Sequence, residues 1–406
     1  MAVWEFNRGE WTEAYVFLRL LGLGRIYGAS TELVKDESTY IDIVNIIRDE
    51  PDKILIFERF VKDEITYVQL FKDNESLKIV TAPEFNEKAD FLYRQLRLLG
   101  TGKRKVAIPE IQEYIENFHI DTPKANLSSE AQKKYGKKTD IIITSEDSLD
   151  HVKTTGGFSI KSHIGSSPTL FNSSQTSGFI YKVVGCNENG MNSLNAKGSF
   201  LDIITSIREK YSLEYVGCRN EIFEQNINMV DSRMDEILQY AMLLFVGFIP
   251  NDSTNTVPSI CNVLALNNPI GVRNPQAFYK AKLKSFLFAS FAGMTASSEW
   301  NGRKMLTGGY IDVDKEGEML YYRAISDDVF ENYLFQHTYF DRPDRGELKE
   351  LAVADAQCFI KENRHLTEQE KIHILNHCHG KKGDFGYVYQ EGNNFYIVIN
   401  FQIRFK

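Results

Sequence analysis

The chain has 406 residues, 43% of them hydrophobic and 25% charged, which is an ordinary composition for a soluble globular protein. Its formal net charge of -8 at pH 7 argues mildly against a nucleic-acid binder, although a locally basic groove on an acidic surface is compatible with DNA binding. There is no apolar run long enough to span a bilayer, no signal peptide, and only five scattered cysteines, so we expect a cytoplasmic protein without a membrane partner.

The first half of the chain predicts helices and strands in alternation. Asn7 is a favourable N-cap and Glu10 its capping-box partner for a helix from about Arg8 to Leu21, which Gly22 to Gly24 terminate. Runs of β-branched and apolar residues, separated by acidic turns, predict strands further on. The expected elements are strands 53–57, 66–71, 76–80 and 140–144, helices 86–99 and 108–118, and a loop or short helix over 121–138.

The second half mixes apolar helices with hairpins. The segment 231–248 is densely apolar and predicts a core helix, and 310–314 with 319–324 predicts a β-hairpin that turns at Gly317. We expect a soft domain boundary near residue 235, with domains over 1–235 and 236–406. The remaining elements are strand 179–184, helices 198–211, 279–291 and 327–337, a polar loop over 251–258, and a final hairpin of 386–390 with 395–405.

One spacing points to chemistry. Asp140 opens a β-branched run, and Ser159-Ile160-Lys161 lies on the strand expected next. Because side chains alternate along a strand, Ser159 and Lys161 point to one face while Phe158 and Ile160 point to the core. A carboxylate and an ammonium so placed suit a divalent metal that assists phosphoryl transfer. The spacing alone also arises by chance in many α/β proteins.

Three blocks of residues carry a family resemblance. They are 7–18; 158–165 with 167–172 and 179–181; and 293–295 with 299–302, 307–310, 331–334 and 400–405. In these blocks, which run in order from end to end, the chain resembles the HpaII family of type II restriction endonucleases. The resemblance implies an α/β PD-(D/E)XK restriction-endonuclease-like core, a mixed β-sheet flanked by helices, with a C-terminal α+β half.

The resemblance also implies a function for each half and a set of partners. Residues 1–235 would form the catalytic domain, and 236–406 a region for DNA binding and specificity. The reaction would be Mg²⁺-dependent cleavage of double-stranded DNA at a short site resembling CCGG, with a partner methyltransferase that protects host DNA. A homodimer is compatible with a palindromic target, since such targets are commonly bound by two-fold dimers, but the sequence identifies no interface.

Within the family layout, Asp140 and Lys161 are the expected catalytic pair, and Ser159 occupies the usual acidic position of the tripeptide. A second carboxylate is therefore expected elsewhere as a metal ligand. Related nucleases place a glutamate on the first helix, which favours Glu13, because Glu10 already has an explanation in capping. If neither residue serves, the next candidates are Glu146 and Asp147, at the far end of the Asp140 strand.

Candidate DNA contacts gather in two places. The segment 165–178 follows Lys161 directly and is dense in hydroxyl and amide side chains that suit phosphate and base-edge contacts; a polar surface loop is the alternative. Arg303 and Lys304 are better suited to guanine. The predicted DNA-binding residues are Ser162, Thr169, Asn172, Gln175, Arg303 and Lys304. Basic clusters at 103–105, 133–134 and 137–138 are further groove candidates, with a solvated surface as the alternative for each.

Other chemistries are less well supported. His373 and His377 are one helical turn apart and could bind zinc, but no glutamate follows the first histidine as in a metalloprotease. The glycine pairs at 156–157 and 308–309 lack the pattern of a phosphate-binding loop. The alternative from another functional class is a DNA-binding protein of the same fold that has lost cleavage, with Ser159 as the sign of decay. The presence of Lys161 argues against that alternative.

Overall fold

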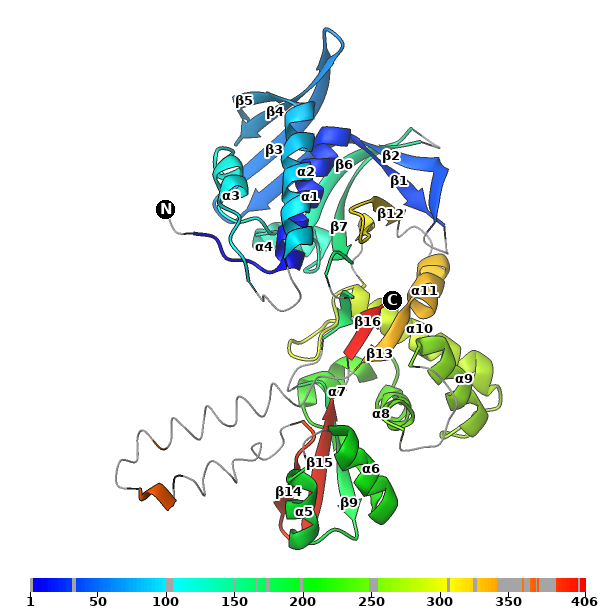
Figure 1. The fold of residues 1–406 in the computed structure, drawn as a ribbon. Coiled ribbons are helices and arrows are strands. Elements are labelled where there is room, and N and C mark those ends of the chain that lie inside the picture. Colours follow the sequence, from blue (N-terminus) through cyan, green and yellow to red (C-terminus); the bar gives the residue numbers. More distant parts are fainter. Residues whose placement is uncertain are drawn as a thin grey trace. The chain divides into compact units, whose positions relative to one another are not determined.

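The chain forms two compact units, each described separately below (Figure 1). The first comprises Met1–Pro168 and Lys304–Tyr333, and the second Thr169–Arg303 and Leu334–Lys406. The computed structural model describes residues 3–30, 34–99, 105–148, 151–165, 167–172, 176–197, 200–247, 255–304, 307–323, 327–341, 360, 366–369, 371, 385–400 and 402–406.

The division differs from the boundary expected near residue 235. It falls at Pro168, and the segment Lys304–Tyr333 from the C-terminal half belongs to the first unit. The physical reason is strand pairing: β11 (Gly309–Val313) pairs in parallel with β7 (Lys153–Ser162), so the first sheet is completed by residues far along the chain.

Within the described residues, the first unit contains a nine-stranded mixed sheet in the order β1-β12-β11-β7-β6-β2-β3-β4-β5. β1 pairs with β12 in parallel and with β2 antiparallel, so the pairings from β1 through β12, β11, β7 and β6 back to β2 close a ring. The other strands are β1 (Arg25–Ala29), β2 (Lys35–Glu50), β3 (Lys53–Lys62), β4 (Ile65–Lys72), β5 (Glu75–Thr81), β6 (Ile141–Asp147) and β12 (Met319–Arg323).

The sheet confirms most of the strands predicted for this unit. The runs at 53–57, 66–71, 76–80 and 140–144 and the hairpin of 310–314 with 319–324 all form strands, with small differences at their ends. The sequence reasoning missed β1 and the long β2. The first half of β2 pairs with β1 and its second half pairs with β3, so this long strand has two successive pairing partners along its length.

Helix α1 (Arg8–Leu23) begins as the sequence predicts. The Asn7 side chain accepts a hydrogen bond from the Glu10 amide at 3.0 Å, and the Glu10 carboxylate accepts one from the Asn7 amide at 2.9 Å, which completes a capping box. The helix ends at Gly24, whose φ of 73° lies in the left-handed region that glycine adopts without strain. This cap fixes where the acidic residues of the first two turns point.

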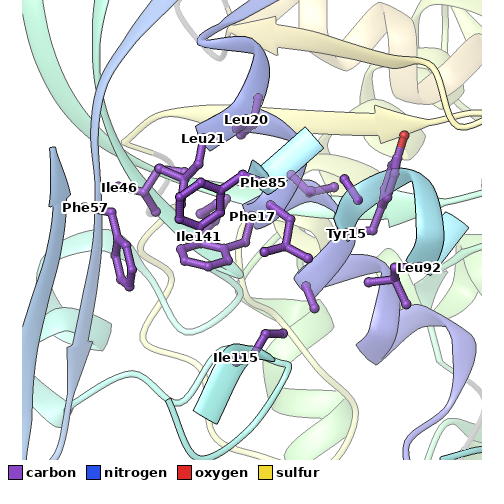
Figure 2. Packing of buried hydrophobic residues seen from close by; sticks show 14 of the residues in the cluster. Tyr15, Phe17, Leu20, Leu21, Ile46, Phe57, Phe85, Leu92, Ile115 and Ile141 are labelled. Atoms are coloured by element: carbon purple, nitrogen blue, oxygen red, sulfur yellow. The ribbon is translucent and has the colours of Figure 1, made fainter. Parts of the chain in front are cut away.

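The core of the first unit lies between the sheet and helices α1 and α2 (Ala82–Leu98), as Figure 2 shows. Aromatic rings interlock across this layer; the rings of Phe17 and Phe57 meet edge to face at 4.9 Å between centroids. α2 begins at Ala82 rather than near residue 86, with Pro83 in its first turn, where a missing N–H costs nothing. The fully buried core residues include Trp11, Leu18, Leu21, Ile46, Phe85 and Leu92.

Two short helices lead to the strand that Asp140 precedes. α3 (Pro109–Glu116) confirms the helix predicted over 108–118, and α4 (Ser129–Tyr135) is the short helix considered for 121–138. The hydroxyl of Ser128 caps α4 by accepting from the Ala131 amide at 3.1 Å. α4 packs its apolar residues against Ile142 of β6, and the chain then passes directly into Asp140.

The second unit contains two antiparallel sheets and several helices. One sheet has the order β10-β9-β15-β14 and the other β13-β16-β8. Its strands are β8 (Thr169–Phe171), β9 (Gly178–Val184), β10 (Ser212–Cys218), β13 (Thr338–Asp341), β14 (Val388–Glu391), β15 (Asn394–Asn400) and β16 (Gln402–Phe405). The helices are α5 (Glu188–Asn195), α6 (Phe200–Lys210), α7 (Glu221–Asn228), α8 (Met234–Phe245), α9 (Val257–Asn267) and α10 (Pro275–Phe291), with α11 (Asp327–Gln336) crossing from the first unit.

Two predictions for this part of the chain need correction. The strand expected over 395–405 is two strands, because β15 pairs with β9 whereas β16 pairs with β8 and β13. The polar segment 165–178 is not all loop, since β8 forms within it. The apolar segment 231–248 does provide the core helix α8. Residues 251–254 of the expected polar loop lie outside the described residues.

Candidate active site

Asp140 is fixed at the start of β6 by its neighbour β7. Its amide donates to the Phe158 carbonyl at 2.8 Å, which continues the β6–β7 ladder by one residue. Its carboxylate oxygen Oδ2 accepts hydrogen bonds from the Ile160 amide at 2.7 Å and the Ser159 hydroxyl at 3.2 Å. Ser159 is buried, so its role in the structure is to hold Asp140.

The strand alternation around Lys161 is as predicted. Phe158 and Ile160 belong to the hydrophobic core, at 4% and 8% exposure, whereas the Lys161 side chain is half-buried. On the next strand, β11, Asp312 is the register partner of Lys161 and Tyr310 that of Ser159. In the antiparallel β6–β7 pair, Ile141 is the register partner of Phe158, so Asp140 and Lys161 lie at the same end of these two strands.

Glu13 reaches the same place from helix α1. It lies in a recess that Asp140, Arg48, Ala125 and Ile141 also line, and its Oε2 accepts a hydrogen bond from the Ala125 amide at 2.7 Å. Loss of surrounding water, together with the negative charge of Asp140, raises the pKa of Glu13 to about 8. A cation bound between these two carboxylates would compensate the negative charge that raises the pKa of Glu13.

Two lysines complete the charge balance. Loss of water also raises the pKa of Asp140, while Lys161 and Lys138 act in the opposite direction. The pKa of Lys138 is lowered to about 7, first by its loss of water and then by the positive charge of Lys161. The sequence reasoning placed Lys138 only in a candidate groove. No strand alternation could have predicted its position, because residues 137 and 138 form a turn before β6.

Glu10 was the alternative to Glu13 as a metal ligand, and both of its carboxylate oxygens already accept hydrogen bonds. One carboxylate oxygen, Oε2, completes the helix cap on Asn7, and the other, Oε1, accepts from Lys124 Nζ at 2.7 Å. The fallback residues are at the other end of β6. Asp147 is buried there, and Glu146 lies 3.8 Å from Lys153 Nζ and 3.6 Å from His151 Nδ1.

The metal-binding capacity of the recess rests on two carboxylates. Among the described residues, no three His, Cys, Asp or Glu side chains gather in a way that could hold a metal ion. Glu13 and Asp140 nevertheless fit a hard cation such as Mg²⁺, which is commonly held by one or two carboxylates and keeps several waters. Their mutual repulsion in the recess is the observation that favours such an ion.

The predicted DNA-binding residues are in varied surroundings. The Ser162 hydroxyl accepts from the Thr12 hydroxyl at 3.0 Å and so ties β7 to α1. Thr169 is half-buried on β8 and Asn172 is exposed just after it, while Gln175 lies outside the described residues. Arg303 is exposed, and Lys304 Nζ lies 3.7 Å from a carboxylate oxygen of Glu331.

Some further candidates can be placed and others cannot. Lys133 and Lys134 are exposed in the last turn of α4, and Lys105 is exposed before α3. Lys103, Arg104 and the histidines at 373, 377 and 379 lie outside the described residues. In the part of the chain that the structure describes, no helix is both long enough and apolar enough to cross a membrane.

Comparison with known proteins defines the class. The chain belongs to the HpaII restriction endonuclease family, which it matches over residues 7–366, and it is therefore a site-specific deoxyribonuclease that acts on double-stranded DNA. A relative over its whole length is the type II restriction enzyme HpaII of Haemophilus parainfluenzae, at 28% identity over 403 residues, which cover 98% of each chain. No solved structure gives a significant match. The family resemblance drawn from the sequence is confirmed, as is the mixed α/β class of the fold.

Proposed function

We propose that this restriction endonuclease hydrolyses DNA at the recess of Glu13 and Asp140, with Mg²⁺ as its metal and Lys161 as its catalytic cation. The observation that carries the proposal is the pair of carboxylates from α1 and the start of β6, which line one recess and raise the pKa of Glu13 to about 8. Enclosed like charges are costly unless a cation compensates them. Family membership supports a divalent metal, since these enzymes generally use one.

Glu13 and Asp140 would hold the metal ion through carboxylate oxygens. When bound, Mg²⁺ supplies Lewis-acid stabilisation of the charge that develops on the phosphoryl oxygens and lowers the pKa of a water. Asp140 is directed by the amide of Ile160 and the hydroxyl of Ser159, so its orientation does not depend on the ion. Ser159 therefore serves as a positioning residue in the place where related nucleases carry an acid.

Lys161 would act on the attacking water and the phosphate. Its ammonium orients the water and offsets negative charge as the water oxygen bonds to phosphorus and the bond to the leaving deoxyribose oxygen breaks. Lys138, beside it, has a pKa lowered to about 7, and in its protonated form it adds positive charge to the same region and strengthens the attraction of the recess for a DNA phosphate. The sheet strands β6, β7 and β11 with helix α1 would then be the PD-(D/E)XK core of the enzyme.

The family resemblance suggests, without establishing, a target and partners for the enzyme. We propose a short G·C-rich site resembling CCGG, a methyltransferase that protects host DNA, and a homodimer that matches the symmetry of a palindromic target. The region after the first 235 residues, which includes Arg303 and Lys304, would carry much of the base recognition. Thr169 and Asn172, which precede it in the sequence, would add further contacts. Gln175 and Ser162 complete the proposed contact set.

A plasmid assay tests the proposal. Supercoiled plasmid is incubated with the protein in Mg²⁺, in Ca²⁺ and in EDTA, and the ends of any fragments are sequenced. We expect discrete fragments in Mg²⁺ alone, with ends that define one short palindromic site. A mobility shift without cleavage in Mg²⁺ would indicate a DNA-binding protein and would overturn the proposed chemistry.

A further inference from the structure

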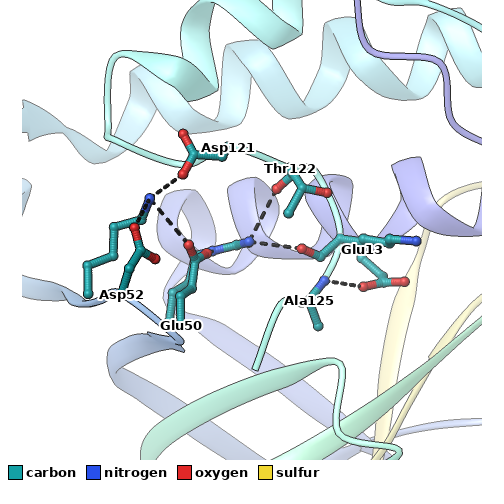
Figure 3. A network of polar contacts seen from close by, with 9 residues as sticks. Glu13, Glu50, Asp52, Asp121, Thr122 and Ala125 are labelled. Carbon is teal, nitrogen blue, oxygen red and sulfur yellow. Dashed lines mark hydrogen bonds and ion pairs between the residues drawn. The ribbon is translucent and has the colours of Figure 1, made fainter. Parts of the chain in front are cut away.

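A short segment lies beside the first turns of α1 and contacts both of its acidic residues. This segment, residues 121–125, is called the strap below. Its Lys124 side chain donates to Glu10 Oε1 at 2.7 Å, and its Ala125 amide donates to Glu13 Oε2 at 2.7 Å. In Figure 3 the strap runs alongside α1, with Ala125 next to the Glu13 carboxylate. The strap therefore determines how the proposed metal ligand Glu13 is presented.

Arg48 on β2 holds the strap through its backbone. One guanidinium nitrogen donates to the carbonyl oxygens of Thr122 at 3.2 Å and Lys124 at 2.9 Å, and Nε donates to Glu50 at 2.8 Å. The Arg48 and Glu50 side chains are only 12% and 2% exposed. A guanidinium suits this position because its planar fork can donate to several acceptors at once.

A second anchor holds the start of the strap. Lys53 on β3 forms an ion pair with Asp121, and its Nζ lies 3.6 Å from the Glu50 carboxylate, so the two cations share one buried acid. The Asp121 side chain is 75% exposed, whereas that of Lys53 is 7% exposed. The two anchors differ in strength, since an exposed partner contributes less to an ion pair than a buried one.

We infer that Arg48 is a positioning residue for the metal site: by holding the Lys124 carbonyl it sets the Ala125 amide, which in turn fixes one oxygen of Glu13. The other oxygen, Oε1, accepts no hydrogen bond from the described residues and is then the oxygen that the cation meets. This inference rests on the proposed function, because it takes Glu13 to be a metal ligand. Residues that orient a metal ligand commonly affect metal affinity about 10–100-fold.

A purely structural role for Arg48 would have a different signature. Arg59 on β3 provides the matched comparison, since its guanidinium also donates to backbone carbonyls of α1, those of Leu21 at 2.9 Å and Gly22 at 3.4 Å, at the opposite end of the helix. If backbone anchoring only stabilises the fold, Arg48→Lys and Arg59→Lys should behave alike. If Arg48 acts through Glu13, only its variant should bind metal more weakly.

The experiment measures Mn²⁺ binding by the full chain without DNA, from the electron paramagnetic resonance signal of free Mn²⁺. The proteins are the wild type, Arg48→Lys, Arg59→Lys, Glu13→Gln and the double variant Arg48→Lys/Glu13→Gln, each also measured for its thermal unfolding temperature. We expect Arg48→Lys to weaken Mn²⁺ affinity about 10-fold and Arg59→Lys to leave it unchanged. In the Glu13→Gln background, Arg48→Lys should have no further effect, because the two residues act as a unit.

A surface variant keeps the test valid if Arg48→Lys proves unstable. Asp121→Asn removes only the exposed end of the weaker anchor, and we expect it to reduce Mn²⁺ affinity about two- to three-fold, a fraction of the usual effect of such supporting residues. Unchanged affinity in both Arg48→Lys and Asp121→Asn, with a clear loss in Glu13→Gln, would overturn the inference and leave the proposed function intact. Unchanged affinity in Glu13→Gln would instead remove Glu13 from the proposed site and the inference with it.

Discussion

Two sets of acidic side chains in the first unit differ in what compensates their charge. Asp312 on β11 is buried, its Oδ1 accepts a hydrogen bond from the Tyr310 hydroxyl, and it lies 3.1 Å from His163 Nε2. Glu13 and Asp140 accept mainly from backbone amides and lie close enough that the charge of Asp140 raises the pKa of Glu13.

The difference separates a structural acid from the pair that we propose to be the metal ligands. The partners of Asp312 are Tyr310, on its own strand, and His163, directly after β7. The Tyr310 hydroxyl in turn lies 3.5 Å from that of Tyr333, so the acid is enclosed and hydrogen-bonded within the chain. The recess instead combines two acids that repel one another with two lysines near them. Perturbed proton affinities of this kind are typical of functional sites.

The largest expected effect concerns the pair in the recess. Asp140→Asn and Lys161→Ala should each reduce single-turnover cleavage of plasmid DNA about 10³-fold or more, because metal and general acid–base contributions are each worth several kcal/mol. The thermal unfolding temperature of Asp140→Asn should be unchanged or slightly higher, since the asparagine side chain keeps an oxygen that can accept from the Ile160 amide and the Ser159 hydroxyl. Lys153→Ala, at the exposed end of the same strand, is the matched control, and near-normal cutting by Lys161→Ala would remove Lys161 from the mechanism.

The second prediction concerns Glu13 and pH in the absence of metal. The pKa of Glu13 is about 8 in the folded chain against 4.5 for an ordinary glutamate, so between these values the folded state retains a proton that the unfolded state loses. The free energy of unfolding of the wild type should therefore fall as pH rises through this window. Relative to the wild type, Glu13→Gln in EDTA should gain roughly 1–4 kcal/mol of stability between pH 5 and pH 8.

Glu10→Gln is the control for that pH series. Glutamine keeps an oxygen for the Asn7 amide but loses the ion pair with Lys124. Glu10→Gln should therefore cost about 1 kcal/mol or less at both pH values, without a pH-dependent gain and with cleavage largely kept. Urea unfolding at pH 5 and pH 8 measures both variants. If the stability gain between pH 5 and pH 8 occurred in Glu10→Gln and not in Glu13→Gln, Glu10 would be the acid with the raised pKa and the proposed metal ligand.

The third prediction concerns Asp312, the buried acid on β11. Asp312→Asn disturbs the hydrogen bonds to Tyr310 and His163 and should lower the free energy of unfolding by about 1–3 kcal/mol, the usual cost of leaving a buried polar group without its partner. Asp235→Asn in the second unit is the matched control, since Asp235 also accepts from a tyrosine, Tyr215 at 3.1 Å, but is only half-buried. Equal losses in the two variants would show that burial does not distinguish these acids.

The smallest effect is expected for the exposed basic residues. Arg303→Ala should weaken binding of a duplex that carries the mapped target site by about 1–3 kcal/mol, and of random DNA by less, if Arg303 reads a guanine. Arg273→Ala, an equally exposed arginine of the same unit, should reduce both alike. Fluorescence anisotropy in Ca²⁺ measures binding without cleavage. Equal losses of affinity for the target duplex and for random DNA would mean that Arg303 contacts a phosphate and does not read a base.

What the sequence predicts well here is local. The Asn7 and Glu10 cap places α1, the alternation of β7 places Ser159 and Lys161, and the turn at Gly317 gives the hairpin of β11 and β12. These features depend on neighbours within a few residues, where cap, strand and turn rules apply.

The rest depends on long-range pairing that the sequence does not display. The parallel pairing of β11 with β7 brings Asp312 beside Lys161 across about a third of the chain and shifts the unit boundary away from residue 235. The strap is equally hidden, since Arg48 binds the carbonyls of residues 122 and 124, and any residue types can supply a carbonyl. Strand register and backbone acceptors leave little trace in residue identity.

The claim that the recess of Glu13 and Asp140 is the metal site is tested most directly by the effect of Mg²⁺ on thermal unfolding. An ion that binds only the folded state raises its unfolding temperature. We predict that Mg²⁺ raises the unfolding temperature of the wild type and of Asp312→Asn by the same amount, and leaves that of Asp140→Asn and Glu13→Gln unchanged. A full Mg²⁺ shift in Asp140→Asn and Glu13→Gln, or its loss only in Asp312→Asn, would contradict the account.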